Sequence, residues 1–288
     1  MKIKKIAFQG WKNCIELTHG DFRIVVTTEV GPRIVGAFLG PKGENLLYLD
    51  KKLLGTSNQK VWTNYGGHRI WHAPEDSVRS YCPDTRKVVV AELRDGGVSF
   101  MAPREELTGI VKTINVYPEG DNSFRIEHQI RNEGLWDIEA AAWGITQLMP
   151  GGTAILPMNH GPEGLVPNRS VNFWPYARPS DPRFVYGNEF VLVKQTAKGA
   201  PTKIGLNSSE GCARTSTTTS SSSSSSSIST RTNIPTSAAP SKSTPRAATS
   251  SSKRSARLPS SNPATKSPTA NIGPPPKSSR FRSITTKT

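Results

Sequence analysis

The segment TNYGGHRIWHAPE, residues 63–75, gathers side chains that can bind a ligand and transfer protons. An imidazole has its ordinary pKa near neutrality, so His68 suits a general acid. Arg69 offers a rigid fork of donors for hydroxyl or carboxylate groups, and Trp71 offers a flat apolar face. Glu75 can accept hydroxyl protons. We therefore predict a ligand site in this segment, with His68 as the catalytic candidate.

Two further residues are candidates for binding. Asn64 lies beside the Gly66-Gly67 pair, and we expect it to line the same groove. His160 lies in PMNHGPEG, residues 157–164, a loop rich in Gly and Pro, and loops often carry binding residues. The candidates also have structural alternatives: core packing for Trp71, an ion pair for Arg69 and Glu75, a hydrogen-bonded polar group for His68, and a solvated loop residue for His160.

A metal site is the competing interpretation of the same segment. His68 and His72 are four residues apart, which would place them on one face of a helix. Gly66-Gly67 and Pro74 argue against a helix, and on a strand such residues stand ~13 Å apart. The three cysteines show no paired spacing that would indicate a disulfide framework or a zinc knuckle. We predict no metal and no cofactor.

The elements that position these residues show the two-residue period of β-strands. FRIVVTTEV, residues 22–30, is rich in β-branched side chains and ends at a Gly-Pro pair. KVVVAEL and VSFMAP flank Asp95-Gly96, a strong hairpin signal because both residues tolerate positive φ. In SFRIEHQIR, residues 123–131, Phe124, Ile126 and His128 share one face. Many short strands separated by turns predict an all-β fold, an antiparallel β-sandwich.

The chain of 288 residues changes composition near Gly211. Residues 212–288 contain five Lys, seven Arg and no Asp or Glu, so they supply +12 of the formal net charge of +15. Such a segment is too poor in apolar side chains to form a core. We predict a folded domain over residues 1–211 and a basic, low-complexity, disordered tail over 212–288, which is either a native appendage or out-of-frame sequence.

Three motifs carry a resemblance to a known family. EVGPRIVGAFLG, NYGGHRIWHAPE and AAAWGITQLMPGG, in this order on an all-β body, resemble the galactose mutarotase-like supersandwich proteins, in particular an uncharacterised bacterial branch with a GGHRxWxAPE signature. The resemblance implies a sugar-binding groove on a concave face, contacted by Arg69. The strand that carries an Asn-His pair in active mutarotases has Trp143 and Thr146 here, and the low-complexity tail replaces the region of the family's catalytic glutamate.

We therefore expect a monosaccharide or a sugar-containing ligand as the partner. The activity is either cofactor-independent interconversion of aldose anomers or epimers, or sugar recognition without catalysis. A third alternative is a protein that associates with nucleic acid or acidic surfaces through its basic tail, but that segment lacks interleaved aromatic residues, so we do not expect nucleic acid as a partner. No apolar run approaches the length of a membrane helix, and we expect a cytoplasmic protein. The sequence does not indicate an oligomeric state.

Overall fold

The computed structural model describes residues 1–84, 87–161, 164–196 and 199–208, together with the backbone of three short strands beyond them. All named elements belong to one compact unit, Met1–Ile234 with Pro276–Thr288, and residues 235–275 lie outside the described part. Apart from one 3-10 turn, η1 (Arg79–Tyr81), these elements are strands with antiparallel pairing. No helix in the described ranges is long and apolar enough to span a membrane.

The first sheet has six strands in the order β1-β2-β3-β4-β5-β10. The first four are consecutive hairpins, and β10 joins β5 across a long sequence separation. Their bounds are β1 (Lys2–Phe8), β2 (Trp11–His19), β3 (Phe22–Thr27), β4 (Arg33–Leu39), β5 (His68–Ala73) and β10 (Ala141–Thr146).

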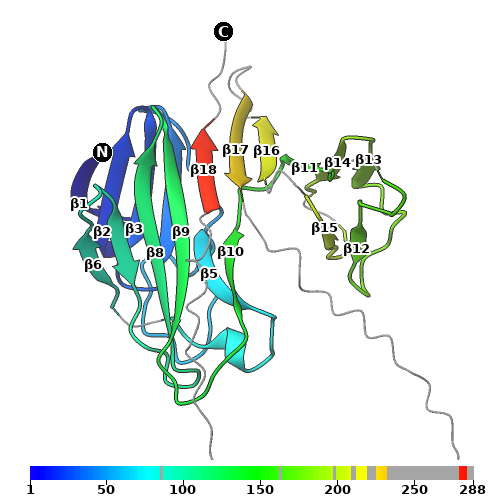
Figure 1. Ribbon diagram of the computed structural model, residues 1–288. Coiled ribbons are helices and arrows are strands. Elements are labelled where there is room, and N and C mark those ends of the chain that lie inside the picture. Colours follow the sequence, from blue (N-terminus) through cyan, green and yellow to red (C-terminus); the bar gives the residue numbers. More distant parts are fainter. Residues whose placement is uncertain are drawn as a thin grey trace, which may run out of the picture. The chain divides into compact units, whose positions relative to one another are not determined.

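The second sheet is built around the long hairpin of β8 (Ile110–Glu119) and β9 (Ser123–Asn132), which Figure 1 shows in green. On one side of the hairpin lie β7 (Val98–Met101) and β6 (Val89–Glu92). On the other side the order continues through β18 (Ser279–Ser283), β17 (Ser225–Arg231), β16 (Cys212–Thr218), β11 (Thr153–Pro157), β14 (Phe190–Lys194) and β13 (Phe184–Tyr186). A separate two-stranded sheet pairs β12 (Val171–Phe173) with β15 (Ile204–Leu206).

The main core lies between the first sheet and the β6–β9 part of the second. Ile24 and Ile34 from the first sheet pack in one cluster with Ile114 and Phe124 from the second, and each is at most 2% exposed. Burying an isoleucine or phenylalanine fully is worth about 1.5–3 kcal/mol. This cluster therefore holds the two sheets face to face.

The outer face of the first sheet carries a second apolar cluster. Val25 and Val35 alternate with the core-facing residues and pack with Trp11 and Tyr65. The connection from β4 to β5 supplies the cover, because Tyr65 belongs to this cluster and the Trp11 Nε1 donates to the carbonyl oxygen of Thr56 at 2.9 Å. The same connection delivers the chain to the start of β5, where the predicted site begins.

The prediction of an all-β, antiparallel, sandwich-like fold is confirmed. The hairpin predicted at Asp95-Gly96 joins β6 and β7, and the Leu93 N–H closes it on the Gly97 carbonyl at 2.9 Å. The disorder predicted for residues 212–288 concerns a segment that lies mostly outside the described residues. Three strands within it, β16, β17 and β18, are described as backbone, and the domain boundary at Gly211 stays a prediction.

Candidate functional site

Two glycines set the start of β5. Gly66 and Gly67 have φ of +91° and +72°, a region that disfavours side chains, and a Cβ on Gly67 would lie 2.3 Å from the Ile34 carbonyl oxygen. This close approach places β5 against β4, with His68 opposite Ile34 and Arg69 opposite Arg33. Successive residues of β5 then point to opposite faces of the sheet.

His68 points into the core between the sheets. It is 1% exposed, its Nδ1 lies 2.8 Å from the Thr146 hydroxyl, and its Nε2 lies 2.7 Å from Nε2 of His128 on β9. Burial, and then the neighbouring His128, hold the pKa of His68 well below its usual value. Burial also lowers the pKa of His128 to about 4. The pair is therefore neutral at neutral pH, with one of the two Nε2 atoms donating to the other.

This position differs from the one expected for a catalytic histidine. His68 was expected in the groove beside Arg69, but the alternation of the strand separates the two side chains, and His68 is not among the residues that line the pocket described below. The physical reason is that His68 shares the face of Ile70, which belongs to the main core cluster. His68 therefore has no part in the function proposed below.

Arg69 points to the opposite face and is buried there without a carboxylate partner. It is 7% exposed, and among the described residues no carboxylate lies within ion-pair distance of it. Its Nη1 donates to the Gln147 side-chain oxygen at 3.0 Å and to that of Asn64 at 3.4 Å. Its guanidinium carbon lies 4.8 Å from the ring centroid of Trp71 and 5.4 Å from that of Trp62. The structure thus brings the predicted Asn64, Arg69 and Trp71 together, and of these three only Trp71 lines the pocket described below.

The environment of Arg69 opposes its charge. Burial first, and then the neighbouring Arg33, lower the pKa of the Arg69 guanidinium to about 10. A cation–π contact is worth about 0.5–2 kcal/mol, whereas removing a charged group from water costs several kcal/mol. The aromatic contacts therefore offset only part of the cost of burying this cation.

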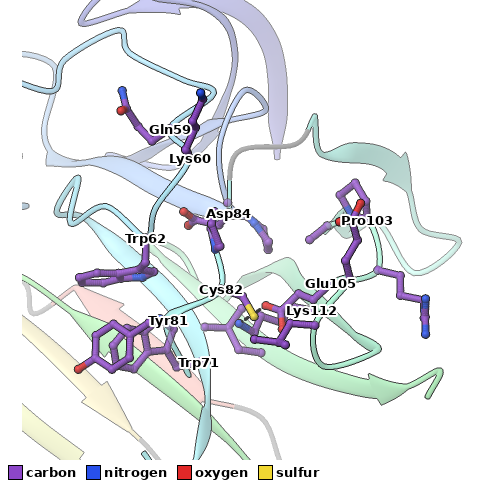
Figure 2. Close-up of a pocket in the computed structure, with 18 of the residues that line it drawn as sticks. Gln59, Lys60, Trp62, Trp71, Tyr81, Cys82, Asp84, Pro103, Glu105 and Lys112 are labelled. Carbon is purple, nitrogen blue, oxygen red and sulfur yellow. Dashed lines mark ion pairs between the residues drawn. The ribbon is translucent and has the colours of Figure 1, made fainter. Parts of the chain in front are cut away.

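Three aromatic side chains form one wall of a pocket. Trp62, Trp71 and Tyr81 meet edge to face, with ring centroids 5.1–5.3 Å apart, and Trp143 of β10 adds a fourth ring 5.8 Å from Trp71. Figure 2 shows the first three rings grouped on one side of the pocket. The T-shaped contacts hold the rings in fixed orientations, which makes this wall a rigid apolar surface.

Glu75 reaches this wall through Tyr81. The Tyr81 hydroxyl donates to a Glu75 carboxylate oxygen at 2.7 Å. This hydrogen bond is the main reason that the pKa of Tyr81 is raised above its usual value. Glu75 itself is exposed and does not line the pocket, so its place is behind the aromatic wall rather than within it.

The other side of the pocket carries buried charges. Lys112 of β8 and Glu105 form an ion pair of 2.5 Å with side chains 8% and 11% exposed, and the Thr108 hydroxyl also donates to Glu105. Asp84 pairs with Arg33 at 2.6 Å. The pocket encloses about 500 Å³, within the range of about 300–1,000 Å³ typical of small-molecule sites. Figure 2 shows Glu105 and Lys112 across from the rings.

The remaining predictions concern residues away from this pocket. His160 is exposed, follows β11 and does not line the pocket. Glu163, in the same loop, lies outside the described residues. Within the described ranges no group of three or more His, Cys, Asp or Glu side chains is arranged to hold a metal ion.

Sequence reasoning missed the partners that complete the site. Trp62 and Tyr81 flank the predicted segment and could have been proposed as site residues, because they add two aromatic side chains to a stretch that is already rich in them. Lys112 could also have been proposed, because it is a single cation among the apolar positions of its strand. No sequence pattern indicated Glu105, because its approach to Lys112 depends on how the β7–β8 connection folds over the pocket.

The geometry is thus a pocket with a rigid aromatic wall, a buried arginine against that wall, and, among the other lining residues, Asp84 and the buried Glu105–Lys112 ion pair. Comparison of the chain with protein-family models, with curated proteins and with solved structures gives no match in any of the three.

Proposed function

We propose that the pocket beside β5 binds a monosaccharide or the sugar part of a larger ligand. The proposal rests on the composition of the pocket, which has a volume of about 500 Å³. Trp62, Trp71 and Tyr81 form an aromatic wall on one side of it, and charged side chains are among the other lining residues. A pyranose ring has apolar C–H faces that pack on aromatic rings, and a rim of hydroxyls that need donors and acceptors. Both kinds of partner line this pocket.

Two lining residues support this class of ligand. Trp62 Nε1 and Asp84 Oδ1 are buried and have no hydrogen-bond partner in the described part of the chain. A buried polar atom without a partner is costly, and a hydroxyl can serve either atom because it both donates and accepts. The resemblance of GGHRIWHAPE to the mutarotase-like supersandwich proteins points to the same class of ligand.

Binding is tested by titrating tryptophan fluorescence with a panel of aldoses, because Trp62 and Trp71 belong to the aromatic wall. We expect saturable changes for at least one sugar, and a loss of affinity of about tenfold in Trp62→Ala, since an aromatic contact and its buried area are removed. Trp136→Ala is the matched control, because Trp136 is 81% exposed and does not line the pocket. Equal losses in the two variants, or no response of the wild type to any sugar, would remove the proposal.

A second candidate is catalysis of anomer or epimer exchange in the same pocket, without a cofactor. Ring opening needs one group that takes the anomeric hydroxyl proton and one that protonates the ring oxygen. Glu105 and Lys112 line the pocket as a carboxylate and an ammonium 2.5 Å apart, which supplies both roles. NMR exchange spectroscopy on the sugars that bind separates the candidates. Exchange faster than buffer supports an isomerase, and exchange equal to buffer leaves a sugar-recognition domain.

The alternative of association with nucleic acid rests on residues 212–288, whose side chains lie outside the described residues. The absence of a nucleic-acid partner therefore stays a prediction, as does the cytoplasmic location.

A further inference from the structure

The face of β5 that carries Arg69 holds more positive than negative charge. Arg33 and Arg69 stand directly opposite each other in the β4–β5 ladder, and they are 0% and 7% exposed. Asp84 pairs with Arg33 at 2.6 Å, and Arg33 also donates to the Gly66 carbonyl oxygen at 2.7 Å. Like charges directly opposite on neighbouring strands destabilise a sheet. The two buried guanidinium groups are therefore accompanied by one paired carboxylate, and that carboxylate forms its ion pair with Arg33 and not with Arg69.

The other groups around Arg69 are neutral, so they do not compensate its positive charge. The side-chain oxygens of Asn64 and Gln147 accept from Nη1, and Nε is buried without a partner among the described residues. The indoles of Trp62 and Trp71 cover the guanidinium but carry no charge. A buried cation of this kind is the feature that an incoming anion satisfies, because a guanidinium binds carboxylate or phosphate oxygens with two parallel hydrogen bonds.

The contacts of Arg69 also show how an anion would reach it. Asn64 is exposed and Gln147 is half-buried, so the guanidinium lies just beneath the surface at that end. The bond to Asn64, at 3.4 Å, is the longer of the two and is the one an anion would replace. On its other side, Arg69 contacts the same two indoles that line the pocket. Arg69 does not itself line the pocket, but the shared indoles make the two sites adjacent, so the ligand must extend past these rings to place a charged group on the guanidinium.

We propose that Arg69 is an anion-binding subsite beside the pocket, and that the ligand is a sugar bearing a carboxylate or a phosphate group. The inference rests on the proposed function, since it names the class of sugar that the same site takes. Arg69 is the group that distinguishes an acidic sugar from its neutral parent, and Trp62 and Trp71 connect the two halves of the site.

The test compares galactose, galacturonate, galactose 6-phosphate and inorganic phosphate as ligands of the full chain, by fluorescence titration and calorimetry. We expect one of the two acidic sugars to bind at least about tenfold more tightly than galactose. The uronate and the sugar phosphate distinguish a carboxylate from a phosphate as the recognised group. An affinity for galactose equal to that of both acidic sugars would overturn the inference while leaving sugar binding intact.

Variants keep the test independent of folding. Gln147→Glu places a carboxylate 3.0 Å from Arg69 and should abolish the preference for acidic sugars, with galactose binding changed less than about threefold. Arg69→Gln should abolish the same preference. Arg23→Gln is the matched control, because Arg23 already pairs with Glu16 at 2.8 Å on the same sheet. A preference that survives in Gln147→Glu would overturn the inference.

The outcomes separate the two proposals. Binding of inorganic phosphate that is lost in Gln147→Glu, with no response to any sugar, would support the anion subsite and remove the carbohydrate function. No binding by any of the four ligands would remove both.

Discussion

The buried ion pair of Glu105 and Lys112 gives the sharpest prediction for stability. With side chains 11% and 8% exposed, the two charges have little water around them, and no second carboxylate of the described residues lies within ion-pair distance of Lys112. Glu105→Gln leaves the ammonium buried without a counter-charge. Breaking a buried pair from one side costs about 3–5 kcal/mol. Because the pair lines a pocket that water can enter, we expect the lower end, about 3 kcal/mol.

Urea unfolding followed by tryptophan fluorescence measures this effect. With a slope of about 1–3 kcal/mol per molar urea, a loss of about 3 kcal/mol moves the midpoint down by about 1.5 M. The double variant Glu105→Leu/Lys112→Met removes both charges and keeps similar volume, so its stability should lie within about 1 kcal/mol of the wild type or above it.

An exposed pair provides the control. Arg131 and Glu133 are 61% and 38% exposed, and Glu133→Gln should cost at most about 1 kcal/mol. A cost for Glu105→Gln no larger than for Glu133→Gln would refute the reasoning. So would a double variant that is less stable than Glu105→Gln alone, because the penalty would then lie in lost packing.

Two further predictions concern β5 and the core behind it. Gly67→Ala should destabilise the protein by more than Gly96→Ala, which should cost roughly 1 kcal/mol. The two glycines have similar φ, +72° at Gly67 and +79° at Gly96, but of the two only Gly67 has an atom within 4 Å of an added Cβ. A similar loss of stability in thermal unfolding of both variants would contradict this. The depressed pKa of His128, about 4 against a usual 6.5, means that below pH 6.5 the unfolded chain binds a proton that the folded chain does not. In urea unfolding at a series of pH values, stability should fall between pH 6.5 and 4 by on the order of 3 kcal/mol, and less steeply in His128→Gln; an equal slope in the two proteins would contradict this.

The local geometry of β5 could be predicted from its sequence. The alternation of His68, Ile70 and His72 against Arg69 and Trp71 is what the structure shows, and the glycine pair before them marks where the strand starts. The expectation that the imidazole and the guanidinium share a groove conflicts with that same alternation. The apolar Ile70 between the two histidines was the signal that their face belongs to the core.

The partners of β5 could not be predicted in the same way. Nothing local in the sequence indicates that β10, some seventy residues later, pairs with β5 and places Trp143 opposite Trp71. Likewise, the arrival of Glu105 beside Lys112 depends on the path of the β7–β8 connection. Short-range patterns determine which face a side chain takes, whereas the opposing wall of a pocket is supplied by segments that are distant in the chain.

His68 and Arg69, which are buried on opposite faces of β5, differ in how their polar groups are satisfied, and this difference bears on where we expect a ligand to bind. On the core face, the imidazoles of His68 and His128 are neutral and bond to each other, so the cost of burying them is offset within the protein. On the other face, Arg69 keeps a charge that no carboxylate of the described residues balances. A fold reaches its lowest free energy when such a charge is paired, and an anion bound from solution pairs it without a change in the fold. We therefore expect an anionic ligand to add stability beside Arg69, whereas the neutral His68–His128 pair offers it no charge to balance.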